Sequence, residues 1–199
     1  MCPDDRMNHT RVVDQRCEQM LMRGLVKETA DLQLNGIFPE MATKAIGYRQ
    51  TLDYLNRDDT SNDEAAAFDA YIDDFTTATR RYAKKQMAWF RKDKDFCFVP
   101  VPLLQSKTDR VAVTAQEVMR LIAMSRDDYE AELSSPKSQS AQTKKRNEAQ
   151  GKTMKFYKFQ RHLLTKGSAE LERALQEAIE CSNRMRSKRK KLDGVAESN

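Results

Sequence analysis

The sequence lacks the long apolar segments that mark membrane-spanning and secreted proteins. Its longest apolar runs, such as residues 96–104, are interrupted by prolines and fall well short of the ~20 apolar residues that span a bilayer. Residues 3–5 are Pro-Asp-Asp, where a signal peptide would carry basic and then apolar residues. We therefore expect no membrane association and an intracellular location, with the cytoplasm, the mitochondrion and the nucleus all open.

Cysteine is also scarce, and its spacing argues against two further classes of protein. The four cysteines stand far apart, at positions 2, 17, 97 and 181. Disulfide scaffolds and zinc fingers both depend on characteristic, closely spaced cysteines. Reduced thiols and the absence of a metal site are therefore expected.

Positive charge is concentrated in two segments rather than spread along the 199 residues. The net charge is +5, but residues 1–75 carry −7, residues 80–94 carry +6 and residues 136–199 carry +9. Such segregation is typical of a surface that binds a polyanion. A solvated helix face followed by a polar tail would have the same composition, so both interpretations stay open at this point.

Apolar residues recur at spacings of three and four, which predicts a mainly α-helical chain. Helices are expected over residues 6–34 (divided near Gly24), 43–56, from a capping box at Ser61 and Glu64 through residue 89, 114–132 and 168–191. A short strand is predicted near residues 95–101, and it must pair with another segment because so short a strand is not stable alone. The third helix carries a seam that we expect to be buried over about six turns, on Phe68, Ile72, Phe75, Thr79, Tyr82, Gln86 and Trp89.

The basic block of residues 80–92 falls on the same helix, beside that seam. At 100° per residue it forms two parallel cationic stripes, namely Arg80, Lys84 and Arg91, and next to them Arg81, Lys85 and Lys92. Arginine and lysine in this arrangement bind phosphate groups, although plain solvated surface has the same pattern. Trp89 suits a core position as well as stacking on a base.

Residues 43–50, Thr-Lys-Ala-Ile-Gly-Tyr-Arg-Gln, form a second candidate site. Gly47 lets a ligand approach the backbone closely, Tyr48 offers a ring and a hydroxyl group, and Arg49 offers a planar fork of donors. An ordinary helix start would contain the same residues, so this alternative stays open.

Three blocks together carry a resemblance to a known family. They are RCEQMLMRGL (16–25), KAIGYRQTLDYL (44–55) and TTATRRYAKKQMAWFRKD (76–93). In this order, and followed by a short strand, they resemble the C-terminal half of the tRNA dimethylallyltransferase (tRNA isopentenyltransferase) family. The resemblance covers residues 4–101, and residues 102–199 have no counterpart in it.

The resemblance implies the helical C-terminal part of a P-loop-type α/β prenyltransferase core. We therefore expect a mainly α chain with one short strand and a partly disordered, basic C-terminal extension. The expected divisions are residues 1–103 (the core portion), 104–133 (a helical extension), 134–167 (a basic low-complexity linker) and 168–199 (a basic helix and tail). The linker is predicted because residues 134–153 contain no Val, Ile, Leu or aromatic residue.

Family members transfer a dimethylallyl group from dimethylallyl diphosphate to N6 of the adenine beside the tRNA anticodon, at position 37. The resemblance thus implies a transferase of tRNA modification, with the anticodon stem-loop as partner and with dimethylallyl diphosphate and Mg²⁺ as the family's ligands. Arg16 matches an arginine that neutralises the diphosphate. The implied tRNA-binding residues are Lys44, Gly47, Tyr48, Arg49, Arg80, Lys84, Lys85, Gln86, Trp89 and Arg91.

The family's donor site depends on a glycine-rich loop of the GxxxxGKS/T type. This sequence contains none, because no two of its six glycines stand five apart, and the family's acidic base has no counterpart either. We therefore predict no catalytic residue and no cofactor in this chain, and an RNA-binding fragment that is inactive alone. Two alternatives stay open: a non-catalytic helical RNA-binding protein, and a protein completed by a partner chain that supplies the P-loop half.

The C-terminal region raises two further expectations. Arg184 and Arg186 near Cys181 suggest a lowered thiol pKa. The run Lys-Arg-Lys-Lys at 188–191 fits a nuclear signal, a nucleic-acid arm or a solubilising end equally well.

Overall fold

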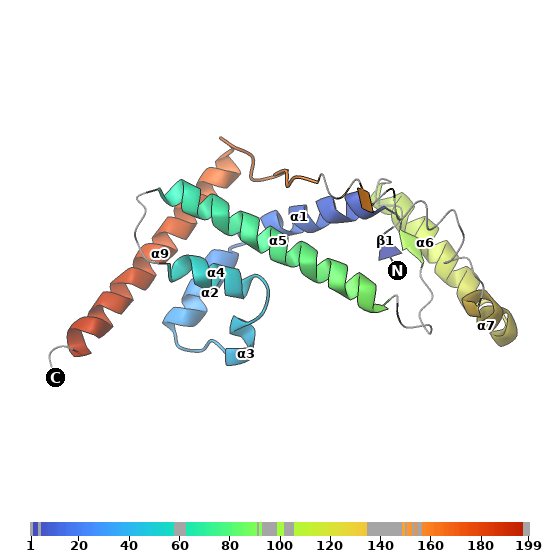
Figure 1. The fold of residues 1–199 in the computed structure, drawn as a ribbon, viewed down its shortest axis with the longest axis horizontal. Coiled ribbons are helices and arrows are strands. Elements are labelled where there is room, and N and C mark those ends of the chain that lie inside the picture. Colours follow the sequence, from blue (N-terminus) through green and yellow to red (C-terminus); the bar gives the residue numbers. More distant parts are fainter. Residues whose placement is uncertain are drawn as a thin grey trace. The chain divides into compact units, whose positions relative to one another are not determined.

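The computed structural model describes residues 2–3, 5–57, 63–90, 92, 99–101, 106–134, 149, 151–152, 154 and 157–196. Most of them are helical, which confirms the mainly α class (Figure 1). The helices are α1 (Arg6–Met22), α2 (Leu25–Leu34), α3 (Glu40–Thr43), α4 (Tyr48–Leu55), α5 (Glu64–Phe90), α6 (Lys107–Ile122), α7 (Arg126–Ser134) and α9 (Ala169–Ala196). The strands are β1 (Cys2–Pro3) and β2 (Pro100–Val101).

The chain divides into two compact units, to which α1 and α5 both contribute. Unit 1 contains Met1–Val12 and Tyr82–Lys158, and unit 2 contains Val13–Arg81 and Phe159–Asn199. The match to the family blocks therefore runs through both units, and each unit also contains later residues. The domain boundaries predicted at residues 103, 133 and 167 stay predictions.

Two glycines set the helix boundaries in unit 2. Gly24 has a φ of 91° and separates α1 from α2, as the sequence predicted. Gly47 has a φ of 97° and precedes α4, and a Cβ atom at this position would lie 3.4 Å from Phe75 Cε2. Both conformations favour glycine. The predicted helix 43–56 is consequently shorter, because Gly47 separates α3 from α4.

The core of unit 2 forms where α2, α4, α5 and α9 meet. Helix α2 contacts both α4 and α9, and the aromatic rings of Tyr54, Phe68, Tyr71 and Phe75 pack together among them. The predicted seam on α5 is therefore confirmed over its first two turns, where Phe68, Ile72 and Phe75 are buried.

The prediction that the seam on α5 stays buried as far as Trp89 is wrong. Thr79 is half-buried, and Tyr82, Gln86 and Trp89 are exposed. The spacing of apolar residues continues beyond Phe75, but the helix face is exposed from Tyr82 onward. Periodicity shows which residues share a face, whereas burial depends on what packs against it.

Helix α9, which lies in the predicted C-terminal extension, belongs to the same core. Ala178, Cys181 and Met185 are buried there. Burial raises the pKa of the Cys181 thiol above its ordinary value, against the smaller opposing effect of Arg184. The expectation of a lowered pKa was wrong because desolvation disfavours the thiolate.

The basic side chains of α9 hold the ends of other helices. Arg184 pairs with Asp31 at 2.7 Å, and Lys188 donates to the carbonyl of Leu34, the last residue of α2. Arg189 donates to the carbonyls of Leu55 and Asn56 at the end of α4, both at 3.3 Å. Cations are favourable at helix C-termini, where carbonyl groups lack partners.

A buried carboxylate ties α1 to the segment before α9. Glu18 has no exposed surface, and its carboxylate accepts hydrogen bonds from the backbone N–H groups of three consecutive residues. The distances are 3.0 Å from His162, 2.7 Å from Leu163 and 2.7 Å from Leu164. These bonds compensate the cost of burying a charge.

A second buried carboxylate lies one helical turn earlier in α1. Asp14 is fully buried, and Arg80 Nη1 lies 3.2 Å from its Oδ2. The same guanidinium donates to the Thr77 hydroxyl at 2.9 Å and lies 5.6 Å from the centre of the Phe159 ring. Arg80 is therefore held inside unit 2.

In unit 1, β1 and β2 form a parallel pair in which Cys2 lies opposite Pro100 and Pro3 opposite Val101. The short strand predicted near 95–101 is present at its last two residues, and β1 is the partner that it needed. Helix α6 contacts β2, and Val99 is buried.

The predicted helix 114–132 is in fact two helices. Ser106 accepts from the N–H of Asp109 at the start of α6, and Ser125 accepts from the N–H of Asp128 at the start of α7. A second capping serine starts a new helix. The apolar side chains of Val118 and Ile122 on α6 are exposed.

Several predictions lie outside the described residues. They concern residues 95–98 of the strand, Arg91, and most of the predicted linker 134–167, including all of 135–148. Within the described part of the chain, no helix combines the length and apolar character that a transmembrane segment requires.

We expect Glu18→Gln to lower the free energy of unfolding by about 2–4 kcal/mol. The amide NH₂ group would face backbone donors that now bond to a carboxylate. Urea unfolding followed by circular dichroism measures the loss. Glu172→Gln, which removes an exposed carboxylate from α9, serves as control and should change stability by less than about 0.5 kcal/mol. Equal effects of the two variants would contradict the anchoring role of Glu18.

We expect Arg80→Ala to destabilise the chain by about 3 kcal/mol, because it leaves the buried Asp14 carboxylate without its cation. Lys84→Ala, one turn further along α5 and exposed, is the matched control. Thermal unfolding of both variants distinguishes the two positions, and an Arg80→Ala protein as stable as Lys84→Ala would refute the structural role of the ion pair.

Candidate nucleic-acid interface

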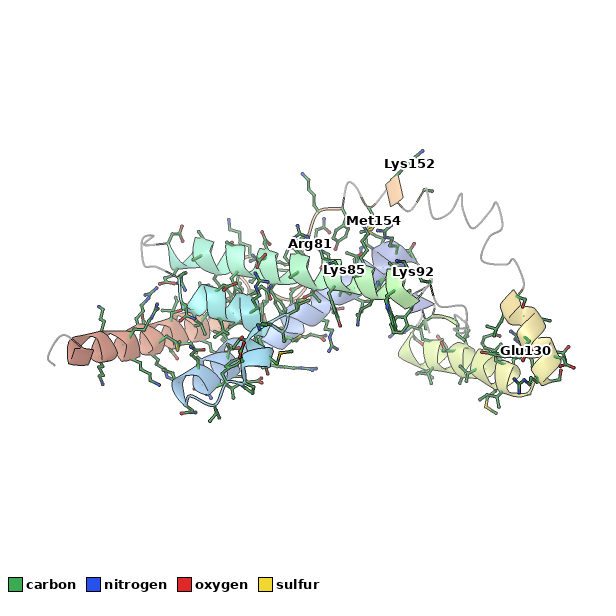
Figure 2. All side chains as sticks on the ribbon, turned by 60° about the horizontal axis from the view of Figure 1, so that its bottom comes forward. Arg81, Lys85, Lys92, Glu130, Lys152 and Met154 are labelled. Atoms are coloured by element: carbon green, nitrogen blue, oxygen red, sulfur yellow. The ribbon has the colours of Figure 1, made fainter. Side chains whose placement is uncertain are left out.

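The C-terminal end of α5 presents cations that lack acidic partners. Arg81, Lys84 and Lys85 on the helix and Lys92 just beyond it are exposed, and none forms an ion pair with a described residue. The sequence explains why, since residues 75–92 contain no Asp or Glu. Lys85 and Lys92 lie toward this end of the helix (Figure 2). Unpaired cations of this kind attract phosphates.

Arg80 differs from its neighbours although the sequence placed it in the same stripe. Its guanidinium is engaged with Asp14, Thr77 and the ring of Phe159. A phosphate that approached it would compete with a fully buried carboxylate. Its predicted role in tRNA binding stays a prediction.

The aromatic and polar residues of this end of α5 are solvent-accessible. Trp89 is 63% exposed and packs edge-on against Phe90, with ring centres 4.9 Å apart. Gln86 is exposed as well. Of the two positions that the sequence allowed for Trp89, core or surface, the structure has the surface one.

The Gly-Tyr-Arg segment lies in unit 2, around the start of α4. The Tyr48 hydroxyl donates to Glu28, a bond that raises the pKa of the tyrosine, and its ring packs edge-on against Phe38. Lys44 pairs with Glu40 at 3.3 Å, and Arg49 lies 3.9 Å from Asp53. Gly47 donates to the Gln50 side chain at 3.0 Å. These contacts are those of a helix start.

The remaining predicted residue, Arg16, is exposed on α1 in unit 2. It pairs with no acidic residue within the described ranges. The structure thus brings Lys44, Gly47, Tyr48 and Arg49 together at α4, while Lys84, Lys85, Gln86 and Trp89 lie together in unit 1.

Sequence reasoning missed the two buried carboxylates of α1. Asp14 and Glu18 stand four residues apart, on the same face as Cys17 and Leu21, which are buried apolar residues. Acidic residues inside an apolar stripe are the signal that could have identified them. Burial also raises the pKa of the Cys17 thiol to about 11, which disfavours the thiolate form.

Metal binding finds no support in the described residues. No three His, Cys, Asp or Glu side chains among them gather closely enough to hold an ion. The Mg²⁺ that the resemblance implies stays an expectation.

In a comparison with known protein families, residues 1–93 match the model of a family described as IPP transferase. A tRNA dimethylallyltransferase of Protochlamydia amoebophila is 39% identical over 92 residues, which are 46% of this chain and 26% of that protein. A second one, of Corynebacterium jeikeium, is 34% identical over 110 residues, 53% of this chain and 33% of that protein.

A plant protein extends the likeness to eukaryotes. The tRNA dimethylallyltransferase 9 of Arabidopsis thaliana is 41% identical over 87 residues, 41% of this chain and 19% of that protein. No solved structure matches the chain. The chain spans a third or less of these relatives' length. Over residues 1–93, this chain is similar to the IPP transferase family.

Proposed function

We infer that this chain takes part in tRNA modification by prenyl transfer, and that its own contribution is to bind the tRNA anticodon arm. The observation that carries this proposal is the set of unpaired cations at the end of α5, within the range that matches the IPP transferase family. The names of the relatives support tRNA as the partner.

The cations of α5 suit an RNA backbone because their charge is not compensated. In α9, by contrast, Arg184, Lys188 and Arg189 are engaged with other helices. Lys84, Lys85 and Lys92 are available to phosphates, and each phosphate contact releases condensed counterions. Binding should therefore weaken steeply as salt concentration rises.

Prenyl transfer requires a site for the diphosphate donor, and we propose that this chain alone does not form one. The sequence contains no GxxxxGKS/T loop whose backbone could cradle a diphosphate. Arg16 would supply one positive charge toward dimethylallyl diphosphate, which stabilises a leaving diphosphate but does not enclose it. A companion chain that provides the P-loop half would complete the site.

We expect Lys84→Ala/Lys85→Ala to reduce the salt dependence of binding to an RNA hairpin with the sequence of an anticodon arm. Two lost phosphate contacts lower the slope of log K against log salt by about 1.4 to 1.8. Fluorescence anisotropy of the labelled hairpin measures it.

The matched control is Arg126→Ala/Arg173→Ala, which removes the same charge from exposed ion pairs of α7 and α9. Its slope should stay close to that of the unchanged chain. If both double variants alter the slope alike, net charge rather than the end of α5 governs binding.

We expect the purified chain to transfer no dimethylallyl group from labelled dimethylallyl diphosphate to the same hairpin. The measurement is the label that stays on the RNA after it is separated from free dimethylallyl diphosphate. As a control, a complete tRNA dimethylallyltransferase should label the same hairpin. Turnover above background by this chain alone would show that it holds a donor site.

A further inference from the structure

Helix α6 exposes an apolar stripe to solvent. Val111 is 61% exposed and Ile122 is 70% exposed, and Ala115 and Val118 between them are exposed as well. These four residues, the α6 stripe, follow one another at intervals of four, three and four, so they lie within about 60° around the helix axis. Met119, which is 64% exposed, lies beside them.

The side of α6 that is shielded from solvent is the more polar one. Its residues, all buried or half-buried, are Arg110, Thr114, Glu117 and Leu121. A helix on the surface of a monomeric protein normally turns its apolar side toward the core. The reversed arrangement in α6 leaves a continuous apolar surface in water, and such surfaces mark sites of protein association.

The charged side chains around the α6 stripe already have partners within unit 1. Arg120 pairs with Glu117 at 2.7 Å and with Glu132 of α7 at 3.3 Å, and Arg126 pairs with Glu130 at 2.9 Å. The stripe itself contains no cation that could bind a phosphate. The chemistry of this surface therefore fits an apolar protein surface rather than RNA.

The residues that flank the α6 stripe favour a second copy of this chain as the partner. Charges at flanking positions select the partner in many pairs of helices. Here the flanks are uncharged, with Ala112 and Met119 on one side and Thr114 and Leu121 on the other. Two identical stripes can therefore meet without repulsion between like charges, as a symmetric dimer requires.

The sizes of the four side chains favour an antiparallel pair. In that arrangement Val111 faces Ile122 of the second copy, and Ala115 faces Val118. A parallel pair would instead place Ala115 against Ala115 and leave a gap between the helices. Opposed helices also bring the positive end of each macrodipole beside the negative end of the other.

We propose that α6 is a dimer interface, in which the α6 stripes of two copies of this chain pack antiparallel. Helix α6 has 16 residues, about four turns, which is a small interface compared with those of permanent dimers. We therefore expect a reversible dimer with a Kd on the order of 10–100 µM. The proposal does not depend on RNA binding or on prenyl transfer.

Sedimentation velocity of the full chain, from about 5 to about 200 µM and with a reductant present, measures the equilibrium. The weight-average sedimentation coefficient should rise with concentration from that of a monomer toward that of a dimer. Because the stripe is uncharged, added salt should not dissociate the dimer, whereas it would release nucleic acid bound to the cations of α5. A monomer at every concentration, or dissociation by salt, would overturn the proposal.

Single charges placed in the stripe test which surface is used. Val111→Glu and Ile122→Lys should each raise the Kd at least about tenfold. Gln116→Glu and Gln116→Lys are the matched controls, since this exposed residue lies about 130° around α6 from the stripe, and they should change the Kd less than about twofold. Equal effects at the stripe and at Gln116 would show that α6 does not pair through the stripe.

Mixing the two stripe variants tests the antiparallel register and also shows that both are folded. The introduced glutamate of one copy then faces the introduced lysine of the other, so the mixture should dimerise within about threefold of the unchanged chain. In a parallel pair the two positions would lie about 16 Å apart along the helices, and mixing would restore nothing. A mixture as weakly associated as its components would therefore contradict the proposed dimer.

Discussion

The carboxylate of Glu18 is the interaction on which the architecture of unit 2 depends. It joins α1 to the backbone at His162–Leu164 through hydrogen bonds of 2.7–3.1 Å, within a site that excludes solvent. The segment it holds leads directly into α9. A charge buried in this way is favourable only while every donor stays in place, so the anchor fixes the chain path as well as adding stability.

Once α9 is anchored, it completes the apolar core that the family-matched helices begin. Phe68, Ile72 and Phe75 belong to one buried cluster of this same chain, which also contains Ala178, Cys181 and Met185 from α9. A partner chain is therefore not needed to cover these positions. The segment after residue 93, which no family block in the sequence explained, supplies part of the core of the matched region.

Local signals in the sequence predicted the elements well, and non-local contacts account for what it could not predict. The break at Gly24 and the glycine at the start of α4 follow from backbone conformations that other residues rarely adopt. The partner of the short strand, Cys2–Pro3, lies almost the whole length of the matched region away. Nothing in the local sequence of Pro100–Val101 specifies a partner at such a separation.

The candidate site shows the same limit, and it also shows what a count of charges leaves out. Arg80 and Lys84 occupy equivalent positions in the sequence pattern, yet one faces a buried Asp14 and the other faces solvent. The basic run of α9 likewise stabilises helix ends through Lys188 and Arg189, a role distinct from all three that its composition allowed. A cation is available to RNA only if the fold leaves it without an acid or a carbonyl to bind. On α5 this condition follows from a stretch without Asp or Glu, and the sequence therefore encodes the availability of Lys84 and Lys85 more directly than it encodes the burial of Arg80.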